Sequence, residues 1–219
     1  MRIKPILFST DMVRAILDGR KTVTRRVLRG EAQQVASDYV RRYSEDLDTS
    51  ELIVHWWVDT ALERYALYRP GDVLWVRETF RVDYLSNIVG SGRVHYKADG
   101  SFGDLHFQPA RYDMMRRAQL KPGWRPNEHM PKEAARIWLR VERLQKMTAA
   151  EAHREGVDSS FSRVSGDEAV GNYVDFSLEK FEPIWDSTIK PEDRKLYGWA
   201  ANPWVWVTAF ERCEPPEEV

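Results

Sequence analysis

The chain has 219 residues, with 33 Lys or Arg, 34 Asp or Glu and a formal net charge of −1 at pH 7. The length suits one domain with insertions, and the balanced charge argues against nonspecific coating of nucleic acid, so any affinity for it must come from local basic clusters. A single cysteine, Cys213, excludes an intrachain disulfide framework and a thiolate metal cluster. With no apolar run long enough for a membrane span and no secretory signal, we expect a cytoplasmic protein with no membrane partner.

The first expected elements are a helix and a strand joined by a tight turn. The helix covers residues 9–18, where Ser9 or Thr10 can cap the first turn and four apolar residues form one stripe. Gly19 supplies the left-handed stop. Residues 22–28 alternate β-branched and polar residues and predict a strand.

The middle of the chain predicts strands separated by polar segments. Residues 29–52 are charged and are expected to form an inserted arm, and LIVHWWV after them predicts a strand. Arg69-Pro70-Gly71-Asp72 is a turn signature directly before a strand over residues 73–80, both faces of which are expected to be covered.

Further strands are expected over residues 93–98, over ARIWLRVERLQKM and over NPWVWVTAFER. Residues 99–131 are expected to be rich in loops. Thr148, Glu151 and Gly156 mark the cap, capping box and stop of a short helix, and NYVDFSLEKFEPIWDSTI predicts another helix.

Several short strands, few helices and no alternating βαβ order predict the α+β class, mainly β: a compact β-barrel decorated with helices. No internal repeat or dividing linker is visible. We therefore expect a single domain over residues 1–219, with insertions at about 29–68 and 157–175.

Residues 19–26, GRKTVTRR, resemble the GxKxxExR signature of the ASCH domain, a PUA-like barrel related to RNA-binding modules. Gly19, Lys21 and Arg26 match this signature, and Thr24 stands where the family has glutamate. PGDVLWVRETF, WRPNEHMP, ARIWLRVERLQ and ANPWVWVTAFER resemble the larger ASCH proteins common in phages and prophages. The resemblance implies a PUA-like fold that binds a nucleoside or RNA.

GRKT followed by a β-branched residue and Thr is also similar to small bacterial ASCH amidohydrolases, which remove the acyl group from N4-acetylcytidine. This resemblance implies a catalytic set of Lys21, Thr24 and Glu155, the last matched by its place in a short helix after a strand. Lys21 would deprotonate Thr24 or a water, and Glu155 would assist proton transfer to the leaving amine. Backbone amides near residues 20–24 could stabilise the oxyanion. The alternatives are a solvated Lys21, a Thr24 that only favours the strand and a solvated Glu155.

Five further residues are expected to bind the substrate. Arg26 and Arg77 could hold a phosphate or a pyrimidine carbonyl, or either could pair with Glu78. His129 could act in acid–base chemistry or fix a loop, and Trp124 could stack on a base. No two histidines have a metal-ligand spacing, so neither a catalytic metal nor a cofactor is expected.

The function expected from these residues is binding of a modified nucleoside or an RNA nucleotide, with hydrolysis of an N4-acylated cytidine as the associated activity. A non-catalytic RNA-binding module and a metal-independent ribonuclease are the alternatives. Nothing in the sequence names a protein partner.

Overall fold

The structure is a computed structural model. It describes residues 1–35, 38, 65–86, 90–121, 123–145, 182–183, 185–201 and 203–217. These residues form strands β1 to β8 and several short helices, and strands predominate, which confirms the expected α+β, mainly β class.

The chain divides into two compact units, which we describe separately. Unit 1 comprises Met1–Arg20, Gly71–Val141 and Phe210–Val219, and unit 2 comprises Lys21–Pro70 and Glu142–Ala209. The predicted single domain with insertions therefore stays a prediction. The expected strand LIVHWWV, the helix at residues 148–156 and the proposed insertion at 157–175 lie outside the described residues.

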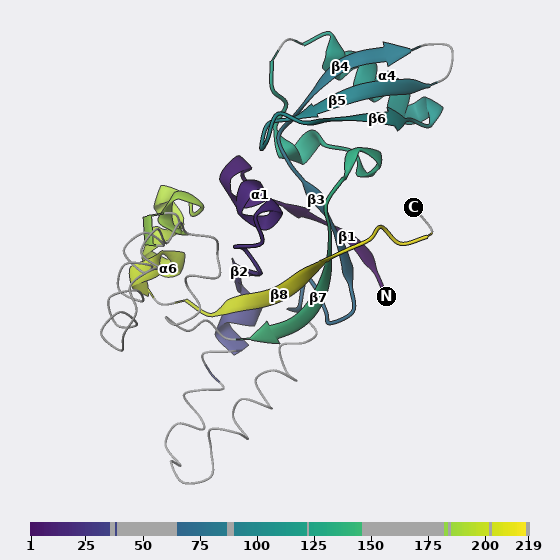
Figure 1. The fold of residues 1–219 in the computed structure, drawn as a ribbon. Helices are drawn as coiled ribbons and strands as arrows, with labels where there is room; N and C mark the ends of the chain where they lie inside the picture. The colour runs from purple at the N-terminus through teal and green to yellow at the C-terminus, as the bar shows by residue number, and fades with distance from the viewer. Residues whose placement is uncertain are drawn as a thin grey trace, which may run out of the picture. The chain divides into compact units, whose positions relative to one another are not determined.

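The first sheet of unit 1 combines parallel and antiparallel pairs (Figure 1). Strand β1 (Ile3–Leu7) runs parallel to β3 (Val73–Arg77), and β3 pairs in the antiparallel sense with β7 (Trp138–Gln145). In the sequence β1 is followed by helix α1 (Thr10–Leu17), whose Ser9 cap accepts a hydrogen bond from the Met12 amide at 3.4 Å. Gly19 ends this turn with φ +74°, so the expected helix and its glycine stop are confirmed.

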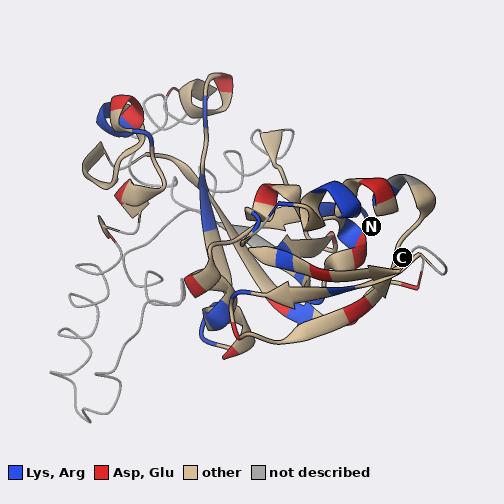
Figure 2. Ribbon diagram, turned by 90° about the horizontal axis from the view of Figure 1, so that it is seen from above, with Lys and Arg blue, Asp and Glu red and all other residues tan. Residues whose placement is uncertain are grey.

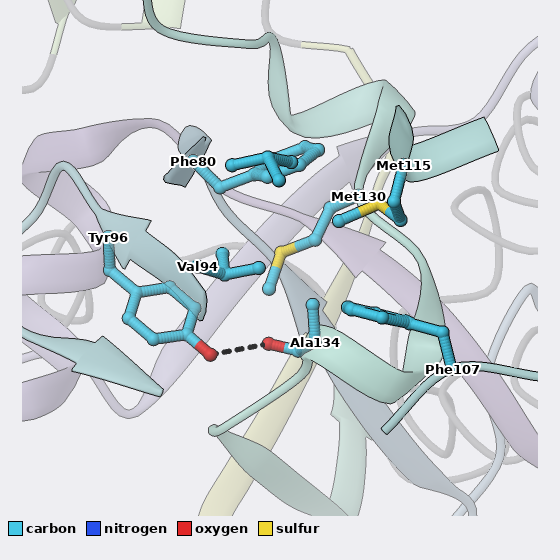
Figure 3. Close-up of a cluster of buried hydrophobic side chains, with 8 residues drawn as sticks. Phe80, Val94, Tyr96, Phe107, Met115, Met130 and Ala134 are labelled. Atoms are coloured by element: carbon cyan, nitrogen blue, oxygen red, sulfur yellow. Dashed lines mark hydrogen bonds between the residues drawn. The ribbon is translucent and has the colours of Figure 1, made fainter. Parts of the chain in front are cut away.

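The second sheet of unit 1 is an antiparallel meander of β4 (Phe80–Ser86), β5 (Ser91–Tyr96) and β6 (Phe102–His106). A β-bulge lies between Val82 and Tyr84. One face of this sheet packs against helix α4 (Pro109–Gln119) and the short 3₁₀ helix η3 (Lys132–Ala134), and the short 3₁₀ helix η2 (Asn127–His129) lies between them in the sequence. Figure 3 shows the core between them, which contains Phe80, Val94, Tyr96, Phe107, Met115, Met130 and Ala134.

Two sequence predictions are wrong in this region. The strand expected over residues 73–80 is interrupted at Glu78 and Thr79, so β3 and β4 belong to different sheets. The interruption lies where Glu78 turns inward to meet Arg136. The loop expected over residues 99–131 contains β6 and α4, which the sequence hides because β6 buries few apolar residues and α4 is basic and weakly apolar.

Unit 2 is built on an antiparallel pair of β2 (Val23–Val27) and residues 205–209 of β8 (Val205–Cys213), and Thr24 lies opposite Thr208. Its core contains Val23, Trp185, Ile189, Val205 and Val207. The short helices η5 (Pro191–Asp193), α6 (Arg194–Tyr197) and η6 (Trp199–Ala201) precede β8. Both faces of the start of β2 are buried, because Val23 and Thr24 point in opposite directions and each is at most 2% exposed.

Candidate functional site

Unit 1 contains a pocket of about 400 Å³ beside α4, the end of β3 and the segment 125–132. Its walls combine basic and apolar side chains, as expected of a site for a small ligand with both characters. The basic lining residues are Arg77, Arg111, Arg117, Lys121, Arg125 and Lys132, and the apolar ones are Trp75, Met114, Met115, Ala118, Met130 and Pro131.

The lining of this pocket is strongly electropositive. Among the described residues that form it, six cations face one carboxylate, Glu128, and one histidine, His129. Figure 2 marks the basic residues in blue, including those on α4. Concave sites lined by one sign of charge concentrate ions of the opposite sign. The pocket therefore suits an anion.

Arg77 is fixed at the end of β3 by its neighbours. Its guanidinium lies 5.4 Å from the centre of the Trp75 ring, within cation–π range. Burial lowers the pKa of Arg77, Glu128 acts to raise it, and Arg111 lowers it further. An arginine nevertheless stays protonated in proteins, so its charge is retained.

Two pocket arginines have spare hydrogen-bonding capacity. The Nε atoms of Arg77 and Arg125 are buried and have no hydrogen-bond partner within the part of the chain that the structure describes. Buried donors usually find an acceptor in the protein, in water or in a ligand. Both guanidinium groups can therefore donate to further oxygen partners.

The structure brings two of the predicted substrate-binding residues together at this pocket. Arg77 and His129 both line it, although they are 52 residues apart in the sequence. Trp124 directly precedes the pocket residue Arg125 and is 41% exposed, with the Arg81 guanidinium 5.4 Å from its ring. Trp124 is thus partly exposed beside the pocket lining.

Glu78, the next residue after Arg77, does not face the pocket lining. It is 1% exposed, and Arg136 donates to both of its carboxylate oxygens at 2.8 and 2.9 Å. Burial raises the pKa of Glu78, and the hydrogen bonds from Arg136 oppose that rise. The sequence identified a buried ion pair correctly but named the wrong arginines, because Arg136 is separated from Glu78 by 58 positions and comes from the segment before β7.

Lys21 and Thr24 lie at the start of unit 2 and are both buried. Lys21 is 2% exposed, and its ammonium donates to the Val23 carbonyl at 2.7 Å, so the alternative of a solvated lysine is wrong. Thr24 is 1% exposed, and its hydroxyl has no hydrogen-bond partner among the described residues. Arg26 is half-buried on the same strand and donates to the Arg25 carbonyl at 3.2 Å.

Glu155, the third residue of the expected catalytic set, lies outside the described residues. Its proximity to Lys21 and Thr24 therefore stays a prediction. Among the described residues, no three His, Cys, Asp or Glu side chains gather as metal ligands would. None of the helices in the described ranges is long and apolar enough to cross a membrane.

The sequence analysis missed most of the pocket, namely Arg111, Arg117, Lys121, Arg125 and Lys132. A signal was present in RYDMMRRAQLK, where Arg117 and Lys121 are four positions apart and Met114 and Ala118 repeat the same spacing. On a helix, residues three or four apart share a face. The prolines around this segment and its low apolar content concealed the helix.

The comparisons with known proteins give one structural match. No protein-family model matches the chain, and no curated protein matches it. The chain is similar to the crystal structure of an ASCH domain from Lactobacillus crispatus JV V101, with 11% sequence identity and a TM-score of 0.32, over 96% of this chain and 79% of that one. This is the family that GRKTVTRR resembles. At so low a TM-score and identity, the match supports no site residue and no activity.

Proposed function

We propose that the protein binds RNA through the basic pocket of unit 1. The observation that supports this proposal is the ratio of six cations to one carboxylate around a pocket of about 400 Å³ that also has an apolar wall. Proteins bind nucleic-acid phosphates mainly through Lys and Arg, and they hold single-stranded bases on apolar or aromatic surfaces. The two kinds of lining match the two parts of a nucleotide.

In this proposal the arginines bind phosphate and the apolar wall contacts the base. The side chains of Arg77 and Arg125 line the pocket, and guanidinium forks match phosphate oxygens in geometry. Met114 and Trp75 are half-buried and line the pocket, and the thioether of Met114 is deformable, which suits a site that accepts different bases. Glu128 would repel phosphate and favour binding of the base edge nearby.

The test is the salt dependence of RNA binding by neighbouring variants of α4. Arg117 lines the pocket and Arg116 does not, although both are exposed arginines on the same helix. We expect Arg117→Gln to weaken binding of a labelled oligouridylate and to reduce the slope of log K against log salt by about 0.7 for each phosphate that is no longer neutralised. Arg116→Gln is the matched control and should change both quantities much less. Equal effects of the two substitutions, or RNA binding that does not depend on salt, would exclude the pocket as the RNA-binding site.

A second candidate function is hydrolysis of an N4-acylated cytidine at Lys21 and Thr24. The observation that favours it is a buried lysine three positions before a buried threonine whose hydroxyl lacks a partner in the described part of the chain. Lys21 would take a proton from Thr24 or from water, and the resulting oxygen would attack the acyl carbon. The C–N bond would then break, and Glu155 would deliver a proton to the exocyclic amine. If Thr24 is the nucleophile, a water would afterwards hydrolyse the acyl-threonine ester and release the carboxylic acid.

This second candidate has a matched pair of variants. Thr24 and Thr208 are directly opposite on β2 and β8, and both are 1% exposed. Thr24→Val should abolish turnover of N4-acetylcytidine, whereas Thr208→Val should retain it. Absence of turnover by the unmodified protein on a broad panel of acylcytidines would remove the hydrolase proposal. Cleavage of labelled RNA in chelator that Lys21→Ala abolishes would favour a ribonuclease instead.

A further inference from the structure

The exposed aromatic side chains of the described residues gather on one face of unit 1. They are Tyr84, Phe102 and Trp124, which are 58%, 54% and 41% exposed. Tyr84 and Phe102 belong to β4 and β6, and the bridge between Phe80 and Arg125 places the segment of Trp124 beside β4. The other face of the same sheet packs on the core shown in Figure 3. Exposed rings on an otherwise sealed sheet mark an interaction surface.

The strand register aligns these rings with cationic side chains. Arg81 pairs with His95, and His95 pairs with Phe102, so the three residues form one row across the sheet. The Arg81 guanidinium extends this row to Trp124, 5.4 Å away, and the His95 ring lies 5.7 Å from that of Phe102. Directly opposed residues of neighbouring strands point to the same face.

A second row lies beside the first. Tyr84 pairs with Arg93, which pairs with Asp104. The Arg93 guanidinium is 4.3 Å from the centre of the Phe102 ring, and Asp104 accepts two hydrogen bonds from it at 2.7 and 2.9 Å. The carboxylate therefore holds Arg93 over the Phe102 ring, which is 54% exposed.

The charged side chains of this face differ in their partners. Asp104 forms an ion pair with Arg93, and Asp83 lies 3.3 Å from His95. Arg81 has no ion pair with any residue in the described ranges, and its guanidinium lies over the Trp124 ring. The face thus offers several rings and a guanidinium without a carboxylate partner among the described residues, which suits stacked bases.

We propose that this open face of β4, β5 and β6 is a stacking surface for the bases of single-stranded RNA. The inference rests on the proposed function and deepens it, because it identifies the ligand as a strand and not a single nucleoside. Trp124 and Arg125 are consecutive, so their Cα atoms are about 3.8 Å apart. One belongs to the row of rings and the other to the pocket lining. A strand bound in the pocket can therefore continue around this edge of the sheet.

The experiment compares uridine monophosphate with oligouridylates of increasing length, using the full chain in low salt. We expect affinity to rise with length, and we expect Phe102→Ala and Tyr84→Ala each to weaken binding of the longest oligomer roughly 5- to 150-fold, the range for loss of one base–aromatic stack. Neither substitution should change the binding of the monophosphate. Phe102→Trp should bind the longest oligomer about as tightly as the unmodified protein, because any aromatic ring can stack on a base.

The matched control is Leu120→Ala, since Leu120 is 77% exposed and lies outside the three-stranded sheet. Oligomers that bind no more tightly than the monophosphate would overturn the stacking surface and leave the pocket proposal intact. The same conclusion would follow if Phe102→Ala and Leu120→Ala had equal effects. If neither monophosphate nor oligomer binds at all, the proposed function itself fails, and the stacking surface fails with it.

Discussion

Unit 1 contains two clusters of charged residues that differ in balance. In the first, Arg136 donates to Glu78 and to Asp99, and its guanidinium also lies 4.1 Å from the Tyr96 ring. In the second, the pocket, six cations face one carboxylate among the described lining residues. The cation of the first cluster is paired with carboxylates of the protein itself. The second has an excess of positive charge, which the proposed RNA ligand would neutralise.

The two clusters differ in what surrounds their arginines, and the pKa of each arginine reflects that difference. Although burial acts to lower the pKa of Arg136, the hydrogen bonds to Glu78 and Asp99 raise it. Arg136 and its two carboxylate partners thus favour one another's charged forms. In the pocket, burial lowers the pKa of Arg77, Glu128 acts to raise it, and Arg111 acts to lower it. Among the described residues, Arg77 thus has no carboxylate that holds it by hydrogen bonds as Glu78 and Asp99 hold Arg136.

The largest expected effect is the loss of folding stability that Arg136→Ala causes. This substitution leaves the buried Glu78 carboxylate without its partner, and breaking a buried pair in this way costs about 3–5 kcal/mol. We expect a correspondingly lower free energy of unfolding in urea. Arg140→Ala is the control, because Arg140 is an exposed arginine of the neighbouring strand. Equal stability of the two variants would show that the first cluster is not structural.

A smaller loss of folding stability is expected from Tyr96→Phe. The Tyr96 hydroxyl donates to the Ala134 carbonyl at 3.0 Å, and burial raises the pKa of Tyr96 to about 12, so the group stays protonated at neutral pH. Removing this bond should cost about 0.5–1.5 kcal/mol in thermal or urea unfolding. Tyr84→Phe removes the hydroxyl of an exposed tyrosine and should have no measurable effect. If Tyr96→Phe left the free energy of unfolding unchanged, the hydrogen bond would not contribute to stability.

The pH dependence of stability should reveal the part played by Asp99. Partial burial acts to raise the pKa of Asp99, but hydrogen bonds from Arg136 and Ser101 lower it from 3.8 to about 2. A lowered pKa stabilises the fold above the unfolded value, so this contribution is lost as the pH falls from 3.8 to about 2. Asp99→Asn should flatten the plot of unfolding free energy against pH in that range. The change in unfolding free energy should be less than about 1 kcal/mol, because the carboxylate is partly exposed. Asp113→Asn, at an exposed site on α4, should not flatten the plot.

The smallest effect concerns the single carboxylate of the pocket. Glu128→Gln removes the one negative charge from the described lining and should increase the affinity for phosphate-containing ligands roughly 1.4- to 5-fold at low salt. The increase should disappear at high salt, because exposed charges are screened. Glu192→Gln changes the net charge equally at an exposed site in unit 2 and should leave the affinity unchanged. A decrease in affinity for Glu128→Gln would show that Glu128 contacts the ligand.

The local elements near the N-terminus could be predicted from the sequence. The Ser9 cap and the Gly19 stop act within a single helix, and the strand after them follows from β-branched alternation. The chemistry of arginine and histidine side chains also pointed to Arg77 and His129, which both line the pocket. These inferences need only residue types and neighbouring positions in the chain.

The assembled sites could not be predicted in the same way. The partner of Glu78 is 58 positions away, and the sequence offered Arg26 and Arg77 with equal chemical reason. The pocket depends on α4, which buries little and therefore lacks a clear apolar stripe. The row from Arg81 to Phe102 depends on the strand register, which residue types alone do not define.

The bulge between Val82 and Tyr84 has a consequence for how this protein can change in length. Asp83 is the extra residue, because Val82 pairs with Val94 and Tyr84 pairs with Arg93, the next position. Loss of Asp83 alone would convert the bulge into a regular ladder and leave Tyr84 and Leu85 on their present faces. A deletion within a strand normally inverts every side chain beyond it. Here the sheet can lose one residue without losing its pattern, so relatives of different length can share the same two faces.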